Sequence, residues 1–366
     1  MADQSVYVPL NALIDFAIEA LVKMGVPHAE AEIVADVLLA ADQYGVRSHG
    51  LAHLKMYYQR LKSGLQQPVT RWTIVHETPT TAVIDGGNGM GMVAGYNAMR
   101  IAIDKARQNG LGAVAVRNSS HYGIAGYYSR MAAKEGMVGM SFTNAHPSIA
   151  PTFGVKPLLG TNPIAFSAPT DEKFEFTFDA ATSIAPRGKI EIAERTGRSI
   201  PKGWVIKEDG SLATKSTNLL KEMNEGKAAL LPLGGSGELM GGHKGYGLAT
   251  VVEILSAAFQ DGAYLSELDD KDKQGNSHPS RIGHFFLAMN IENFVPLDHF
   301  RNTTGGILRE LRESGLGNKR IYTAGEQSYY GAVQVAQEGV KVGPNLQKAL
   351  IMLRTELNIT RHDLGF

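Results

Sequence analysis

Residues 112–143 read GAVAVRNSSHYGIAGYYSRMAAKEGMVGMSFT, and this stretch decides the fold class. The apolar run at 112–117 predicts a β-strand, and the run at 138–143 predicts another. Between them lies a polar loop, followed by small and apolar residues whose spacing predicts a helix over 124–134. Strands that alternate with helices are typical of α/β layers, in which helices pack on a sheet. We therefore predict a sheet around this stretch, with the polar loop at the carboxyl end of its first strand.

The same alternation continues on both sides of this stretch. Further strands are predicted at 73–75, 81–84, 174–178, 204–206 and 285–289. Further helices are predicted at 96–108, 245–260 and 304–314. No repeat of fixed period accompanies them, so the elements belong to one layered α/β architecture and not to a repeat array.

Residues 8–64 have a different pattern, because apolar side chains recur there at the spacing of a helix. Two helices are expected before residue 44, and a third is expected over 51–62. The character of the sequence changes near residue 70. We therefore predict a helical N-terminal domain over 1–70 and a mixed α/β domain over 71–303.

The composition excludes several classes of protein. The 366 residues include 36 Lys and Arg and 36 Asp and Glu, so a formal net charge of zero offers no general attraction to nucleic acid or to anionic membranes. The lack of cysteine excludes disulfides, iron–sulfur clusters, thiolate zinc sites and cysteine nucleophiles. Neither a signal-peptide pattern nor an uncharged apolar run of about 18 residues is present. We therefore expect a soluble, globular, cytoplasmic protein.

The glycines at 89–94 imitate a dinucleotide-binding fingerprint. Gly89-x-Gly91-x-x-Ala94 follows a predicted strand and precedes a predicted helix, as that fingerprint requires. An acidic residue should then end the next strand and hold the ribose hydroxyls, but that strand ends in Arg117. The sequence therefore favours a structural glycine turn over a Rossmann cofactor site.

Residues 233–247, LGGSGELMGGHKGYG, imitate a phosphate-binding loop. His243 stands where such a loop requires lysine, and Gly245 stands where it requires a hydroxyl group for Mg²⁺, so an NTPase site is disfavoured. The glycines nevertheless present backbone N–H groups beside Lys244, ahead of a predicted helix. Two alternatives stay open here: an anion site, or a flexible loop with a solvated lysine.

Two polar clusters place histidines where they could transfer protons. Ser48 and His49 precede a predicted helix, whose dipole disfavours the charged form of a histidine at that position. His121 follows the strand at 112–117, at the sheet edge where open α/β sheets bind ligands. Either histidine could serve as a general acid or base. The structural alternatives are a capping serine beside an incidental histidine, and a loop histidine with satisfied hydrogen bonds.

The pair His49 and His53 has the i, i+4 spacing of zinc ligands on a helix. Gly50 replaces the glutamate that follows the first histidine in zinc proteases, and no third ligand lies nearby in the sequence. We therefore expect no metal site.

A third polar cluster, FDAATS at 178–183, follows another predicted strand. Its Asp179 could hold ribose hydroxyls, orient a histidine, or cap the next turn, and the cap is the commonest use of such a residue. The residues alone leave these three roles open.

Five motifs, taken together, resemble one family. They are RSHG (47–50), RNSSHYGIAGYY (117–128), LGTNPIAFSAPT (159–170), FDAATS (178–183) and GGHKGYGL (241–248). In this order and at these distances they resemble the malate/L-lactate dehydrogenase family of the non-Rossmann type, over roughly residues 8–360. The run at 229–248 is most similar to the malate dehydrogenase branch.

The resemblance implies a mixed α/β fold that is unrelated to the Rossmann lactate and malate dehydrogenases. In it, a helical N-terminal part, with C-terminal helices at about 304–366 nearby, packs on a mixed-sheet cofactor domain. Members are typically homodimers with the site near the subunit interface. They reduce 2-oxo acids or related imines with NADH or NADPH.

For the cofactor, the resemblance implies contacts with Asp179, Ala180, Ala181, Lys244 and the loop near Arg281, where Ala180 replaces the methionine that the family usually has. An aspartate beside the ribose favours NAD, because it would repel a 2′-phosphate. NADP stays open as an alternative, since Arg187 and Lys189 follow shortly after and could accept a phosphate group.

For the chemistry, the resemblance implies that His49 or His121 transfers the proton, with Ser48 beside them. It implies a substrate site that includes Arg47 and Asn162. The chain departs from the family at His53, where members often carry an arginine suited to the substrate carboxylate. Either a protonated His53 replaces that arginine or another cation does, of which the candidates are Arg47, Lys55 and Arg187.

The resemblance therefore predicts an NAD(P)-dependent 2-hydroxyacid dehydrogenase that interconverts (S)-malate and oxaloacetate. Within the same family the alternatives are L-lactate, sulfolactate, ureidoglycolate, diketogulonate or a cyclic imine as substrate. A remote alternative is a nucleotide-binding protein without catalytic activity. No nucleic acid or membrane partner is expected.

Overall fold

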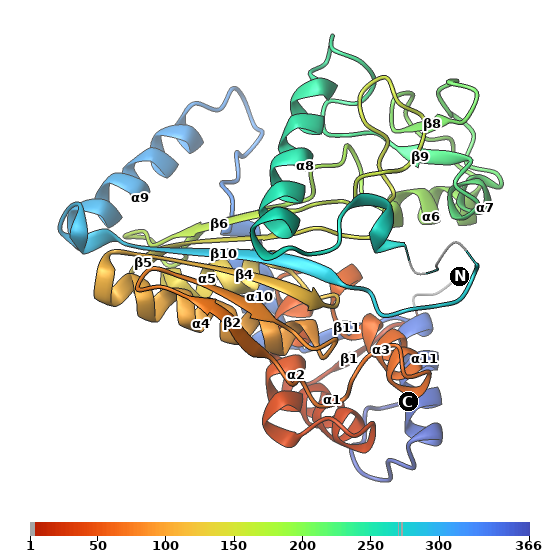
Figure 1. The fold of residues 1–366 in the computed structure, drawn as a ribbon, viewed down its shortest axis with the longest axis horizontal. Coiled ribbons are helices and arrows are strands. Elements are labelled where there is room, and N and C mark those ends of the chain that lie inside the picture. Colours follow the sequence, from red (N-terminus) through yellow and green to blue (C-terminus); the bar gives the residue numbers. More distant parts are fainter. Residues whose placement is uncertain (1–3, 270, 272–273) are drawn as a thin grey trace.

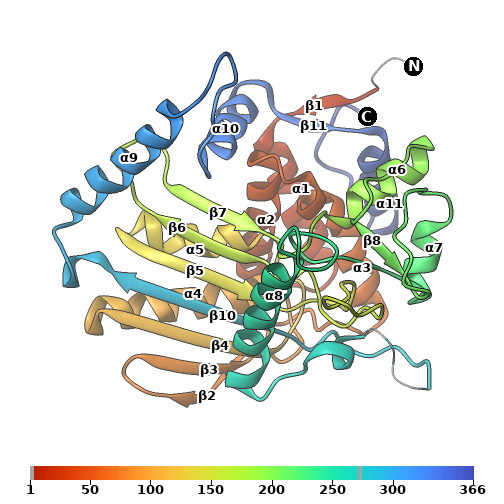
Figure 2. The same ribbon diagram turned by 90° about the horizontal axis from the view of Figure 1, so that it is seen from above.

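A seven-stranded mixed β-sheet runs through the computed structural model, which describes residues 4–269, 271 and 274–366. Its strands are β2 (Thr73–Glu77), β3 (Thr81–Asp85), β4 (Leu111–Ser119), β5 (Met137–Thr143), β6 (Ile164–Ala168), β7 (Phe176–Ala180) and β10 (Ile282–Asn290). They lie in the order β2-β3-β4-β10-β5-β6-β7 (Figure 2). Only β3 and β4 are parallel, so the sheet is mixed.

The predicted α/β layers are confirmed, with differences in detail. The strand predicted at 174–178 begins two residues later, as β7, and the short strand β6 was not predicted. β10 lies between β4 and β5, although β4 and β5 are much closer to each other in the sequence.

Helices cover both faces of the sheet (Figure 1). α4 (Gly91–Asn109) and α5 (Ala125–Lys134) pack on one face, and α8 (Gly242–Ala257) packs on the other. Two strand glycines allow the first contact, because a Cβ at Gly112 would overlap the carbonyl oxygen of Ala102, and a Cβ at Gly139 would overlap that of Ser129. The core between the sheet and α4 and α5 contains Met99, Val114, Tyr128 and Phe286.

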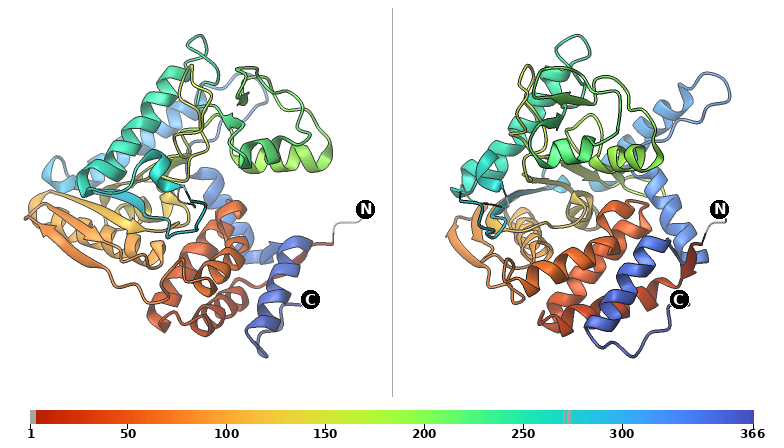
Figure 3. Two further views of the ribbon diagram at one scale, coloured as in Figure 1. Left: turned by 45° about the vertical axis from the view of Figure 1, so that its right-hand side comes forward. Right: turned by 90° about the vertical axis from the view of Figure 1, so that its right-hand side faces the viewer.

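The N-terminal helices share a second core with the end of the chain. α1 (Leu10–Lys23), α2 (His28–Gln43) and α3 (Leu54–Lys62) pack with α11 (Pro344–Glu356), and strand β1 (Val6–Val8) pairs with β11 (Val340–Val342). Figure 3 shows these two ends of the chain side by side. α10 (Glu326–Glu338) contacts α2, whereas α9 (Leu297–Glu313) lies away from these helices, near the far end of the sheet (Figure 1).

The span predicted as one domain over 71–303 contains a further small core of its own. α6 (Arg187–Thr196), α7 (Leu219–Asn224) and the antiparallel pair of β8 (Val205–Lys207) with β9 (Ala228–Leu230) enclose it. Short 3₁₀ turns η3 (Ala258–Gln260), η4 (Leu265–Leu268) and η5 (Ile291–Asn293) complete the connections. Within the described residues, no helix combines the length and apolarity needed to cross a membrane.

Candidate active site

Three histidines from two distant parts of the chain form a cluster. The turns η1 (Arg47–His49) and η2 (Leu51–His53) connect α2 to α3 and bring His49 and His53 towards His121, which follows β4. The ring centroid of His121 lies 4.9 Å from that of His53 and 5.6 Å from that of His49. The centroids of His49 and His53 are 5.7 Å apart. The structure thus brings together both histidines predicted to be catalytic and the histidine that departs from the family pattern.

A buried carboxylate holds the two turns in place. Asp42, near the end of α2, is only 4% exposed and accepts a hydrogen bond from the backbone N–H of Leu51 at 2.8 Å. A side chain at Gly50 would overlap this carboxylate, which explains the glycine between the two turns. Burial raises the pKa of Asp42 to about 6. The sequence analysis did not find Asp42. An aspartate that follows two alanines in an apolar helix was the signal that could have identified it.

His121 is anchored through one ring nitrogen. Its Nδ1 lies 2.6 Å from the hydroxyl oxygen of Tyr57, a fully buried side chain on α3. The backbone N–H of Gly123 points to the same nitrogen from 3.4 Å. Tyr57 was also missed by the sequence analysis, because a tyrosine inside an amphipathic helix carries no signal of a polar contact.

The loop that carries His121 rests on a buried histidine of β10. The Nε2 of His284 lies 2.8 Å from the Ser119 hydroxyl, and its Nδ1 lies 2.8 Å from the Thr143 hydroxyl. Its ring stacks on Tyr122 with centroids 4.4 Å apart. Burial lowers the pKa of His284 to about 3, so this imidazole is neutral and ties β4 to β5 across the central strand.

The clustered histidines are held in their neutral forms. Burial lowers the pKa of His49, and burial together with the nearby His49 lowers the pKa of His53 to about 4. The pKa of His121 is lowered well below its usual value by burial and by His53, His49 and His284. Among the described residues, no carboxylate accepts a hydrogen bond from any of these three clustered rings. The cluster therefore offers neutral donors and acceptors that a bound anion can polarise.

Asp179 connects β7 to the helix that follows the His121 loop. Its Oδ2 accepts a hydrogen bond from the backbone N–H of Gly126 at 2.7 Å, in the first turn of α5. Of the three roles left open by the sequence, the structure thus shows a cap, although on a helix distant in sequence. The other oxygen, Oδ1, has no hydrogen-bond partner among the described residues, and the side chain is exposed. Ala180 and Ala181 follow it at the end of the strand.

Lys244 lies in the first turn of α8 and is exposed, with no described residue paired to its ammonium group. A Cβ at Gly245 would overlap the carbonyl oxygen of Leu233, so this glycine allows the start of the helix to approach the preceding loop. Arg281 adopts a left-handed φ of 49° just before β10 and donates to the carbonyl of Glu267 at 2.6 Å. Lys244 therefore lies at the exposed start of α8, and Arg281 lies just before β10 with one guanidinium nitrogen already bonded to a backbone carbonyl.

A family model for malate/L-lactate dehydrogenases matches residues 8–351. The chain belongs to this malate/L-lactate dehydrogenase family. The resemblance inferred from the five motifs is therefore confirmed, and the chain is a nicotinamide-dependent dehydrogenase.

Several family members are similar over almost their whole length. The malate dehydrogenase of Pyrococcus abyssi is 46% identical over 88% of this chain and 87% of that protein. The L-sulfolactate dehydrogenase of Methanocaldococcus jannaschii is 38% identical over 94% of this chain and 96% of that protein. The solved malate dehydrogenase of Entamoeba histolytica has a TM-score of 0.93 and 40% identity, covering 98% of this chain and 99% of that one. The mixed fold described above is therefore the fold of this family.

The glycines at 89–94 of this dehydrogenase form structural turns. The backbone N–H of Met90 donates to the Thr70 hydroxyl at 3.1 Å, and that of Gly91 donates to the Ser120 hydroxyl at 2.9 Å. A Cβ at Gly91 would overlap the carbonyl oxygen of Ser120. Because the protein's own hydroxyls fill the N-terminus of α4, a pyrophosphate has no place there. Ser120 instead links this turn to the His121 loop.

The two other residues predicted to bind substrate differ in accessibility. Arg47 is exposed beside the histidine cluster. Asn162 is fully buried, and its Nδ2 donates to the Ala249 carbonyl at 3.0 Å and to Glu253 at 2.8 Å. The described contacts of Asn162 are structural, so its role in substrate binding stays a prediction. Arg187 donates to Asn224, on the small third core.

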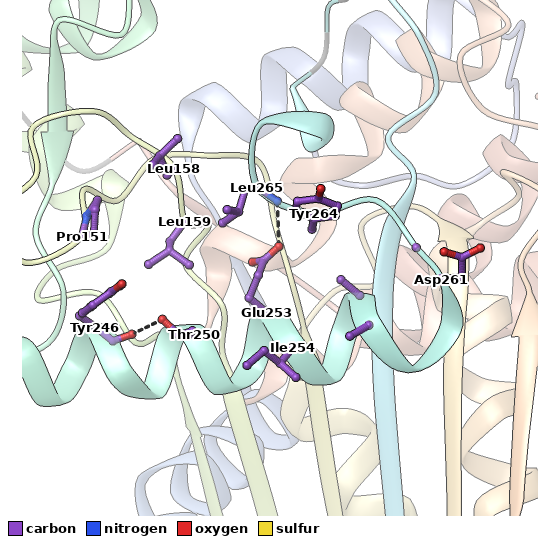
Figure 4. Close-up of a pocket in the computed structure, with 13 residues that line it drawn as sticks. Pro151, Leu158, Leu159, Tyr246, Thr250, Glu253, Ile254, Asp261, Tyr264 and Leu265 are labelled. Atoms are coloured by element: carbon purple, nitrogen blue, oxygen red, sulfur yellow. Dashed lines mark hydrogen bonds between the residues drawn. The ribbon is translucent and has the colours of Figure 1, made fainter.

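A large apolar pocket lies apart from the residues of the histidine cluster. It has a volume of about 450 Å³ and lies between α8 and the loops that contain Leu158 and Tyr264 (Figure 4). Its one buried charged group, Glu253, already accepts hydrogen bonds from the Leu265 N–H and from Asn162. Asp261, Tyr246 and Tyr264 also line this pocket, but none of the three clustered histidines does. Among the described residues, no group of three His, Asp or Glu side chains is arranged to hold a metal ion.

Proposed function

We propose that this enzyme interconverts (S)-malate and oxaloacetate, with NAD as its cofactor. The observation that carries the proposal is the cluster of His49, His53 and His121, whose neutral rings can surround a small oxo acid. Two relatives named malate dehydrogenase, at 46% and 44% identity, support the choice of substrate.

The residues of the cluster suit the reduction of a 2-oxo acid. When bound, the reduced nicotinamide supplies a hydride to the carbonyl carbon. His49 or His121 donates a hydrogen bond to the carbonyl oxygen and supplies the proton that converts the developing alkoxide to a hydroxyl. The Ser48 hydroxyl, 2.9 Å from Nδ1 of His49, orients that ring. The His53 ring, which has no hydrogen-bond partner among the described residues, and the exposed Arg47 would bind the carboxylates.

Residues at the start of α8, just before β10 and at the end of β7 suit parts of a dinucleotide. Lys244, with the backbone N–H groups that begin α8, would hold the pyrophosphate, and Arg281 would add a second positive charge. The free Oδ1 of Asp179 would accept hydrogen bonds from ribose hydroxyls, beside the small side chains of Ala180 and Ala181. A carboxylate at this point disfavours a 2′-phosphate, which supports NAD over NADP.

The proposal is tested by following NADH and NADPH oxidation at 340 nm against oxaloacetate, pyruvate, sulfopyruvate, oxalurate, 2,3-diketogulonate and piperideine-2-carboxylate. We expect the highest kcat/KM with oxaloacetate and NADH. His49→Ala and His121→Ala should each lower turnover by about 100-fold or more. His28→Ala, at an exposed position on α2, is the matched control. A higher kcat/KM with another oxo acid or imine would overturn the choice of malate and direct attention to His53.

We further infer that the enzyme is a homodimer. The outward face of α8 supports this, because Leu248, Val251 and Ile254 are each 42–52% exposed there and lie next to an apolar pocket. Light scattering should give a mass of about twice 39.4 kDa. Val251→Glu should shift the mass towards the monomer, whereas Ile192→Glu, on an equally exposed site of α6, should not. A monomeric wild type would overturn this inference.

The need for a nicotinamide cofactor supports a cytoplasmic location, where such cofactors are available. Cell fractionation followed by detection of the protein tests this, and recovery outside the cytoplasmic fraction would contradict it.

A further inference from the structure

The surroundings of the contact between Tyr57 and His121 favour one direction for its hydrogen bond. The Tyr57 side chain is fully buried, and its hydroxyl has one hydrogen-bond partner among the described residues, Nδ1 of His121 at 2.6 Å. Burial raises the pKa of Tyr57, so the phenol keeps its hydrogen at every physiological pH. A buried hydroxyl hydrogen without an acceptor is costly, so the Tyr57 hydroxyl donates to Nδ1.

A second donor points to the same nitrogen. The backbone N–H of Gly123 approaches Nδ1 of His121 from 3.4 Å, and a backbone N–H can only donate. A hydrogen on Nδ1 would therefore face two other hydrogens. The neutral ring must carry its hydrogen on Nε2, which has no partner among the described residues and is not enclosed.

We propose that Tyr57 is a positioning residue that fixes neutral His121 as its Nε2–H tautomer, so that His121 donates a hydrogen bond to the substrate oxygen without exchanging a proton. This inference rests on the proposed function, since it assigns roles within that site. A nitrogen that already carries a hydrogen cannot accept one from the substrate hydroxyl. Of the two histidines proposed for proton transfer, His49 is then the one that exchanges the proton.

His49 is free to change its protonation state. The contact it makes through Nδ1 is with the Ser48 hydroxyl, which can rotate to donate or accept. In oxidation, neutral His49 takes the hydroxyl proton at Nε2 while the hydride leaves the same carbon for the cofactor. In reduction, the imidazolium of His49 returns that proton to the oxygen. The titratable groups that face His121 are His49, His53, His284 and Tyr57, and none of them is acidic at neutral pH.

The tautomer is measured directly in the protein without substrate, by NMR of the protein labelled with ¹⁵N in its histidine rings. The His121 signals are assigned by their loss in His121→Asn. We expect Nδ1 of His121 to resonate as an unprotonated nitrogen and Nε2 as a protonated one. In Tyr57→Phe the two forms should mix, whereas in Tyr58→Phe, which removes the next hydroxyl on α3, the spectrum of His121 should not change.

Protonation of Nδ1 in the wild type would overturn the proposal, even if Tyr57→Phe does not fold. An unchanged His121 spectrum in a folded Tyr57→Phe would also overturn it. Neither result depends on which oxo acid is the substrate, so a failure of the malate assignment is distinguishable from a failure of the tautomer assignment.

The roles assigned to His121 and His49 are tested by pH–rate profiles with the best substrate of the panel. In His121→Gln the amide nitrogen replaces Nε2 as a donor that cannot titrate. We expect this variant to keep the ionisation of kcat/KM and to retain at least about ten times the activity of His121→Ala, because a single hydrogen bond to the reacting oxygen is commonly worth that much. His49→Gln should lose the ionisation. Loss of the ionisation in His121→Gln, with retention in His49→Gln, would refute the assignment.

Discussion

Replacing Asp179 by asparagine separates two roles that one carboxylate could combine. Oδ2 caps α5 through the Gly126 N–H at 2.7 Å, and Oδ1 is free for the cofactor. Asparagine keeps a carbonyl oxygen for the cap, and it loses only the favourable interaction of a negative charge with the helix N-terminus, about 0.3–1 kcal/mol. Alanine removes the cap itself, which costs about 0.5–2 kcal/mol.

The effect on the cofactor should be larger. Hydrogen bonds from ribose hydroxyls to a charged carboxylate are worth about 1.5–3 kcal/mol, which corresponds to a roughly 10- to 150-fold weaker affinity when the charge is lost. Asp179→Asn should therefore raise the Kd for NADH by that factor while leaving stability within about 1 kcal/mol. Its affinity for NADPH should fall less, because the repulsion of a 2′-phosphate disappears together with the charge.

The assays are urea unfolding without cofactor and fluorescence titration with NADH and NADPH. Asp209→Asn is the control, since Asp209 accepts hydrogen bonds within an exposed turn far from the site. If Asp179→Asn and Asp179→Ala both bind NADH within about twofold of the wild type, Asp179 is only a helix cap and the cofactor assignment is refuted.

Three further changes test the framework of the site. The wild type should lose at most about 3 kcal/mol of unfolding free energy as the pH falls from 6.5 to 4, because His53 has a folded-state pKa of about 4. His53→Asn should not show this loss. Urea unfolding that gives the same pH dependence for both proteins would contradict this. Gly91→Ala should destabilise by about 2 kcal/mol or more through overlap with the Ser120 carbonyl, and a wild-type melting temperature would refute the close approach. Asp42→Ala should lower the free energy of unfolding by about 1–3 kcal/mol and should lower kcat, because it leaves the Leu51 N–H without its acceptor. Asp42→Asn should retain most of the stability and most of kcat. Equal losses in the two variants would contradict the role of this hydrogen bond.

Much of the secondary structure could be predicted from local patterns. The strand at 112–117 and the helix at 124–134 have strong periodicity, and they reappear as β4 and α5 with small shifts at their ends. β6 escaped prediction because it lies between Pro163 and Pro169, and prolines argue against a strand in their neighbourhood. α10 and α11 were not separated, since the prediction treated about 304–366 only as a set of C-terminal helices.

The candidate site was predicted in its residues but not in its contacts. The motifs identified His49 and His121, although 72 positions separate them in the chain. They did not identify Tyr57, Asp42 or His284, because each of these acts through hydrogen bonds whose partners lie in other elements. The sequence around such a residue shows no unusual pattern, so its role can be recognised only when the tertiary structure gives the position of its partner.

The sequence by itself determined where most strands and helices form, which family the chain resembles, and which two histidines could transfer the proton. These properties depend on local spacing and on residue identity, which are complete in the linear chain. The tertiary structure alone decided that β10 separates β4 from β5, that Asp179 caps α5, and that the Tyr57 hydroxyl contacts Nδ1 of His121. Those contacts join residues 53 to 178 positions apart, and their stability comes from burial and hydrogen bonds that exist only once the sheet and both helical layers have assembled.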